Sequence, residues 1–301
     1  MAGALLLGLQ LGCAEPRQEE ALPLTCAAAE RLDFASAERQ RRALRALFLA
    51  TDKKPHAADS LALVDARLKA HIDDWQERGK KLACSSNPAV RECLARRAQN
   101  LRATLETLLE LDAETLEFAI DAAAALEPAS ACSRSSGVLD GQFTPALNEL
   151  RLQVARARAL AHSGQVWAAL KAAREANSAI ERTHADAPHR PETGEKNKSQ
   201  TSQTSQTDAD TGIDLSHDRL AIAVDAKTLL GGLLADTGDA DAALEMLERA
   251  HRQATIIRDP YRLLSIQTAR AQIIGLRQGQ LVEALALCTR ARTDALPLVE
   301  L

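Results

Sequence analysis

The sequence LAIAVDAKTLLGGLLADTGDADAALEMLERAHRQA spans residues 220–254 and decides the fold. Its pattern predicts a helix, a tight turn at Gly238 and a second helix. Gly231, Ala243 and Ala250 place small side chains where the two helices touch, so that their backbones can approach closely while leucines fill the sides. One such hairpin cannot bury its apolar face alone, and we therefore expect neighbouring copies that stack on it.

Two further copies surround this unit, each counted outward from a turn glycine, Gly164 or Gly279. Small residues recur five and twelve positions after each turn glycine, which is the small-residue pattern of tetratricopeptide repeats. Gln272 departs from the pattern, because a small residue is expected seven positions before Gly279. We therefore predict about three tetratricopeptide-like repeats over residues 141–301. The recurring small residues are Ala169 and Ala176, Ala243 and Ala250, and Ala284 and Ala291.

A loop is predicted to interrupt the array at residues 185–214. The interval from Gly164 to Gly238 is about 33 residues longer than the interval from Gly238 to Gly279. The excess matches a stretch with two prolines and three successive Ser-Gln-Thr copies at 199–207. Because this composition buries too little apolar surface to order itself, we expect a disordered loop there.

Residues 15–140 are predicted to form a bundle of antiparallel helices joined by short loops. Aromatic residues make up only 2% of the 301 residues, while the helix formers Ala and Leu dominate. Pro88 suits the first turn of a long helix. The chain is therefore expected to be all-α, with a helical bundle followed by a tetratricopeptide-like α-solenoid. An apolar stripe at intervals of three and four, which we assign to the core, comprises Leu61, Val64, Leu68, Ile72 and Trp75.

The charge and the cysteines limit the chemistry of the chain. A net charge of -4 argues against a nucleic-acid surface. No cysteine spacing matches a metal site, so we expect neither a metal nor a cofactor. Cys84 and Cys93 flank a turn and would pair there in an oxidising compartment; the alternative is that they are small buried apolar residues. The six cysteines are Cys13, Cys26, Cys84, Cys93, Cys132 and Cys288.

Residues 1–14 begin with an apolar run that is too short to cross a bilayer. Two interpretations stay open for this segment. It is either the remainder of a longer membrane helix or a signal-like segment, with Leu11-Gly12-Cys13 resembling a lipoprotein cleavage site. Either interpretation predicts membrane association through the amino terminus. The helical part would then lie outside the cytoplasm, and a cytoplasmic location is the alternative.

The order of motifs resembles the carboxy-terminal region of membrane-anchored serine/threonine protein kinases of myxobacteria and their relatives. The resemblance covers roughly residues 15–301. It implies a helical region with tetratricopeptide repeats that follows a kinase domain and a single membrane helix. The motifs that carry it are Cys26, Trp75 with Cys84, Arg91-Glu92-Cys93-Leu94 with Arg97, the 116–126 segment with Cys132, Leu150-Arg151-Leu152, and Ala155 to Leu160 with Gly164.

The chain lacks the kinase motifs themselves: it has no glycine-rich phosphate loop, no His-Arg-Asp and no Asp-Phe-Gly. Without them nothing holds ATP and magnesium, so we expect no enzyme activity. The resemblance implies a protein–protein interaction or sensory module. The alternatives are a non-functional remnant of a truncated kinase gene and an enzyme of unknown class.

The first helix of each repeat is expected to line a groove that takes a protein or peptide partner. We also expect the apolar end of the array to allow self-association. By repeat position, the candidate groove residues are Arg151, Arg158 and His162 in the first copy, Asp225, Thr228 and Asp236 in the second, and Arg277 in the third, beside the apolar Ile273 and Leu276.

Overall fold

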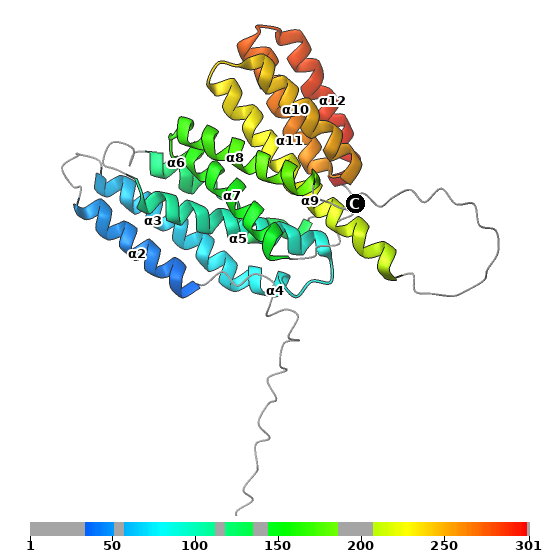
Figure 1. The fold of residues 1–301 in the computed structure, drawn as a ribbon. Helices are drawn as coiled ribbons and strands as arrows, with labels where there is room; N and C mark the ends of the chain where they lie inside the picture. Colours follow the sequence, from blue (N-terminus) through cyan, green and yellow to red (C-terminus); the bar gives the residue numbers. More distant parts are fainter. Residues whose placement is uncertain (1–33, 51–56, 112–117, 135–143, 186–206, 300–301) are drawn as a thin grey trace, which may run out of the picture.

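The computed structural model describes residues 34–50, 57–111, 118–134, 144–185 and 207–299 (Figure 1). Within these ranges all regular structure is helical, which confirms the all-α prediction. The predicted apolar segment at 1–14 lies outside them, as do Cys13 and Cys26. The longer helices are α2 (Phe34–Ala50), α3 (Ala57–Asp74), α5 (Pro88–Leu109), α7 (Pro145–His162), α8 (Val166–Ala185), α9 (Thr207–Asp236), α10 (Ala240–Ile257), α11 (Pro260–Gln272) and α12 (Leu281–Val299). The shorter ones are η1 (Trp75–Gly79), α4 (Lys80–Leu82), α6 (Ala119–Ala124), η3 (Ala129–Arg134) and η4 (Ile273–Arg277).

Helices α2, α3 and α5 pack around an apolar core in the amino-terminal part (Figure 1). The stripe predicted over residues 61–75 is buried along its whole length, and Trp75 belongs to this core. Pro88 is the first residue of α5, as predicted, and the Asn87 side chain caps that helix by accepting a hydrogen bond from the Ala89 amide at 2.9 Å. The sequence pattern therefore placed these helices and their buried faces well.

The disulfide differs from the pairing considered from the sequence. Cys93 bonds to Cys132, with 5.6 Å between their Cα atoms, and thus joins α5 to η3. Cys84 is exposed and takes no part in this bond. The reason is burial: α5 carries Cys93 into the amino-terminal core, where Cys132 is also buried, while Cys84 stays at the surface.

Three helical hairpins follow within the described residues: α7 with α8, α9 with α10, and α11 with α12. Their turn glycines, Gly164, Gly238 and Gly279, all have positive φ angles of 76°, 95° and 71°. Glycine adopts this left-handed conformation without the penalty that a side chain would add. The three positions found by counting along the sequence are therefore the turns inside the three hairpins.

Successive hairpins lie side by side, with α8 against α9 and α10 against α11 (Figure 1). Five of the six recurring alanines are buried, and Ala284 is half-buried. Helices α8, α9 and α10 contribute to one continuous apolar cluster that reaches into α11. Small residues at the crossing points thus allow the hairpins to share a core.

The predicted boundaries of the 185–214 loop were too wide. Ala185 is still the last residue of α8, and α9 already begins at Thr207. Extending an existing helix costs less than nucleating one, so a stable helix grows into flanking sequence of weak propensity. The remainder of the predicted loop, residues 186–206, lies outside the described residues.

Two neighbouring glycines in α9 offer a matched test of the hairpin packing. A Cβ atom added at Gly231 would lie 2.8 Å from Leu247 Cγ and 3.2 Å from the Ala243 carbonyl oxygen, whereas one at Gly232 meets nothing within 4 Å. We expect Gly231→Ala to lower the free energy of unfolding by about 1–3 kcal/mol through overpacking. Gly232→Ala should raise it by about 0.5–1 kcal/mol, because alanine favours the helix. Urea unfolding followed by circular dichroism measures both, and equal shifts would contradict the close helix contact.

Candidate functional site

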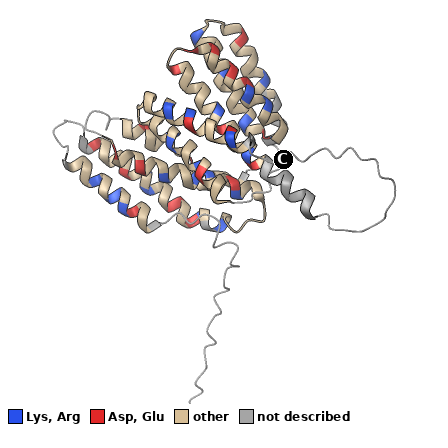
Figure 2. Ribbon diagram, viewed as in Figure 1, with Lys and Arg blue, Asp and Glu red and all other residues tan. Residues whose placement is uncertain are grey.

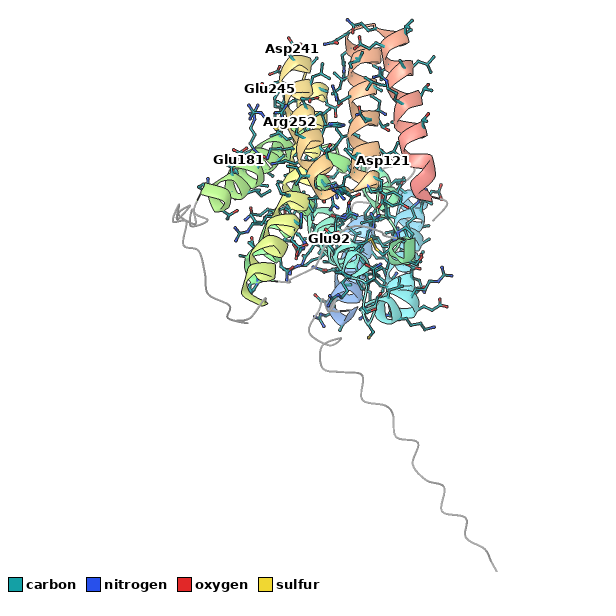
Figure 3. The ribbon with its side chains drawn as sticks, turned by 90° about the vertical axis from the view of Figure 1, so that its right-hand side faces the viewer. Glu92, Asp121, Glu181, Asp241, Glu245 and Arg252 are labelled. Carbon is teal, nitrogen blue, oxygen red and sulfur yellow. A yellow bond between two sulfur atoms is a disulfide. The ribbon has the colours of Figure 1, made fainter. Side chains whose placement is uncertain are left out.

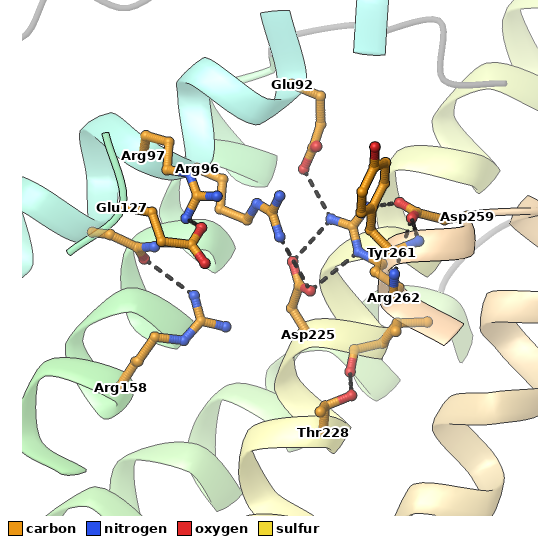
Figure 4. Close-up of polar contacts among 12 residues, drawn as sticks. Glu92, Arg96, Arg97, Glu127, Arg158, Asp225, Thr228, Asp259, Tyr261 and Arg262 are labelled. Atoms are coloured by element: carbon orange, nitrogen blue, oxygen red, sulfur yellow. Dashed lines mark hydrogen bonds and ion pairs between the residues drawn. The ribbon is translucent and has the colours of Figure 1, made fainter. Parts of the chain in front are cut away.

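Four of the seven candidate groove residues line one cavity of about 740 Å³. Arg158 and His162 reach it from α7, and Asp225 and Thr228 reach it from α9. Figure 4 shows Arg158, Asp225 and Thr228. The first helices of the hairpins therefore do face a shared hollow. Its volume lies within the range of about 300–1,000 Å³ that is usual for ligand pockets.

The other three candidates do not line this cavity. Arg151 is buried near the start of α7, where its Nη1 donates to Asn148 Oδ1 at 3.1 Å. It lies about two turns from Arg158 along the helix, which places it beyond the end of the hollow. Asp236 and Arg277 form an ion pair at 3.7 Å between the end of α9 and η4.

Helix α5 forms the opposite wall of the cavity, which sequence reasoning missed. It contributes Glu92, Arg96, Arg97 and Asn100. Figure 3 shows Glu92 in the middle of the molecule, between the amino-terminal helices and the hairpins. The sequence feature that could have indicated this wall is the charged run 91–97 in a helix otherwise rich in Ala and Leu. A solvent-exposed helix face would explain the same charges equally well.

One side of the cavity is organised by Arg262 of α11, which is 5% exposed. Its Nε and Nη2 atoms donate to both carboxylate oxygens of Asp225 at 3.1 and 2.9 Å. Nη2 also contacts Glu92 Oε1 at 3.2 Å, and Nη1 pairs with Asp259. Asp259 in turn caps α11 by accepting from the amides of Tyr261 and Arg262 at 3.0 Å. One guanidinium thus links α5, α9 and the start of α11.

These contacts shift the ionisation of both partners. Burial alone would raise the pKa of Asp225, but the charges of Arg262 and Arg96 outweigh it and hold that pKa well below its usual range. Burial alone would lower the pKa of Arg262, but Asp225, Glu92 and Asp259 raise it well above its usual value. Asp225 and Arg262 therefore both stay ionised at neutral pH.

The other side of the cavity gathers cations. Arg97 pairs with Glu127, and Arg96 lies 3.8 Å from Asp225. Arg158 donates from Nη1 to Asn100 Oδ1 at 3.4 Å (Figure 4). Burial, reinforced by the nearby Arg96 and Arg158, lowers the pKa of Arg97 to about 9. Burial also lowers the pKa of Arg158.

His162 completes this side at the rim of the cavity. Burial first, and then the charge of Arg158, lower its pKa below the usual 6.5, so its imidazole is neutral at pH 7. It therefore adds hydrogen-bonding capacity but no charge. Among the described residues no group of three or more His, Cys, Asp and Glu side chains could hold a metal ion. What the arrangement can do is bind a charged, hydrogen-bonding group between opposed walls.

Comparison of the chain with protein-family models, with curated proteins and with solved structures finds no match. The interpretation of the cavity thus depends on its own geometry. Lys and Arg alternate with Asp and Glu along most helices (Figure 2), so the separation of charge inside the cavity contrasts with the mixed outer faces. In the described ranges no helix is both long and apolar enough to span a membrane.

Proposed function

We propose that the chain is a non-catalytic binding module whose hairpins form a tetratricopeptide-like array. Such a region would resemble the one that follows the membrane helix in bacterial serine/threonine kinases. The proposal is based on one observation: the first helices of three successive hairpins all contribute to the same cavity, through Arg158, Asp225 and Arg262. The buried alanines and the left-handed turn glycines support the repeat assignment.

The partner would be a protein or peptide segment that enters the cavity between α5 and the hairpins. Tyr261 is 45% exposed and lies beside the opening, where its ring offers an apolar surface next to charged groups. Exposed apolar side chains of the last hairpin support the self-association expected at the end of the array. They are Leu276, Leu281, Val282 and Leu285.

The test is selection of peptides by the full chain from an immobilised random library. We expect a defined set of sequences to be retained. The Thr228→Trp variant should lose at least tenfold in affinity for them, because the indole would occupy part of the cavity. Thr268→Trp is the matched control: Thr268 is exposed on α11, and its hydroxyl donates to the carbonyl four residues earlier, as that of Thr228 does.

The control variant should bind like the wild type. Retention of the same peptides by both tryptophan variants would show that binding occurs outside the cavity. Failure of the wild type to select any peptide would contradict the proposed function and favour the alternative of a non-functional remnant.

A further inference from the structure

The two sides of the cavity differ in charge balance. Arg262 meets three carboxylates, those of Glu92, Asp225 and Asp259. On the other side three guanidinium groups, of Arg96, Arg97 and Arg158, face a single carboxylate of their own, that of Glu127. The second side therefore holds an excess of about two positive charges when Asp225 is assigned to Arg262, its closer partner.

Arg158 is the least compensated of these cations. Within the described part of the chain, no carboxylate oxygen lies within 4.0 Å of its guanidinium, and its polar contact is the neutral Asn100 amide. Removing a cation from water without a counter-charge is costly. An anion that entered the cavity would remove this cost, and that gain would appear as binding energy.

The lowered pKa values of Arg97 and Arg158 have the same origin. Burial is the largest cause for each, and Arg96 adds repulsion in both cases, while the charge of Asp225 offsets part of the shift in both. With a pKa of about 9, Arg97 is still protonated at pH 7. The three guanidinium groups come together from two different helices, α5 and α7 (Figure 4).

We propose that Arg96, Arg97 and Arg158 form a subsite for a phosphate monoester. The dianion of a monoester, with a charge of about -1.5 to -2 at pH 7, matches the excess of positive charge better than a single carboxylate does. Its three peripheral oxygens can each accept from a guanidinium, and planar guanidinium groups suit such bidentate contacts. The subsite rests on the proposed binding function, since it specifies which group of the ligand enters the cavity.

The probe is phenyl phosphate, with benzoate as the matched monoanion, titrated into the full chain by calorimetry at low salt. We expect phenyl phosphate to bind at least tenfold more tightly than benzoate. Arg158→Gln should weaken phenyl phosphate binding by at least tenfold. Arg156→Gln is the matched control, because Arg156 lies on the same helix but is 61% exposed and pairs with Glu110 at 3.6 Å outside the cavity; it should bind like the wild type.

A second measurement covers the case in which Arg158→Gln does not fold. Phenyl phosphate should raise the thermal unfolding midpoint of the wild type more than benzoate does at equal concentration, and added salt should reduce the difference. Equal effects of the two probes, or equal weakening by the Arg156 and Arg158 variants, would overturn the subsite.

Two further measurements identify the source of the phosphate and show whether the subsite or the peptide-binding function fails. If a phosphoserine peptide binds more tightly than phenyl phosphate and its unphosphorylated form does not bind, the phosphate belongs to a peptide ligand. If the phosphoserine peptide and phenyl phosphate bind with equal affinity, the phosphate belongs to a small monoester. If the chain still selects peptides but shows no preference for phenyl phosphate over benzoate, the subsite alone is refuted. Loss of peptide selection with phenyl phosphate binding intact would refute the peptide-binding function alone.

Discussion

Replacing Arg262 with methionine is expected to lower the free energy of unfolding by about 3–5 kcal/mol, the range seen when one partner of a buried ion pair is removed. The variant would leave Glu92, Asp225 and Asp259 close together without their shared cation. It would also remove the link between α5, α9 and α11. Urea unfolding followed by circular dichroism at pH 7 measures the loss.

The pH dependence distinguishes this mechanism from simple loss of packing. In the wild type the pKa of Asp225 is depressed in the folded state. Its contribution to the free energy of unfolding is therefore fully present above about pH 4, the pKa of an unfolded Asp, and is lost as the pH falls toward the folded-state pKa. Without Arg262 that pKa rises. The stability difference between wild type and variant should therefore shrink below about pH 4, and a constant difference would refute the electrostatic account.

Arg252→Met is the control for Arg262→Met. Arg252 projects from the outer face of α10, where it is 64% exposed and pairs with Glu248 at 3.7 Å (Figure 3). Exposed pairs of this kind contribute at most about 1 kcal/mol. A loss in this variant as large as in Arg262→Met would mean that arginine replacement is costly for reasons unrelated to the cavity.

The hairpins were predictable because their determinants are local. A turn that needs a left-handed residue selects glycine, and two helices that cross closely select alanine or glycine at fixed distances from that turn. Gly164, Gly238 and Gly279 therefore marked the reversals from the sequence alone. The boundary at Thr207 was missed because it depends on how far a helix extends into sequence without a strong preference of its own.

The cavity was only half predictable. Residues such as Arg158 and Asp225 were identified because repeat position specifies which face of a first helix lines the groove. The opposite wall depends on how the amino-terminal helices fold back on the array, which no local pattern encodes. The contact between Glu92 and Arg262 joins residues 170 positions apart in the chain. The separation of charge across the cavity follows from that contact, so the sequence alone could not reveal it.

The second large effect is expected from the disulfide. Replacing both Cys93 and Cys132 with alanine should lower the free energy of unfolding by about 4 kcal/mol, because the bond closes a loop with a sequence separation of 39 and so restricts the unfolded chain. Cys288→Ala is the control, since Cys288 is exposed and outside the bond; its effect should stay within about 0.5 kcal/mol. Urea unfolding of the oxidised proteins measures both.

Reduction provides an independent route to the same state. Dithiothreitol should bring the wild type close to the stability of the double variant and leave the variant itself unchanged, because both treatments remove the same covalent bond. If Cys93 paired with Cys84 instead, Cys84→Ala would reproduce the full loss and Cys132→Ala would have little effect. That outcome would also remove the covalent link between α5, whose Cys93 lines the cavity, and η3, whose Ala131 lines it too. The stability of these variants therefore tests the disulfide and the shape of the proposed binding site together.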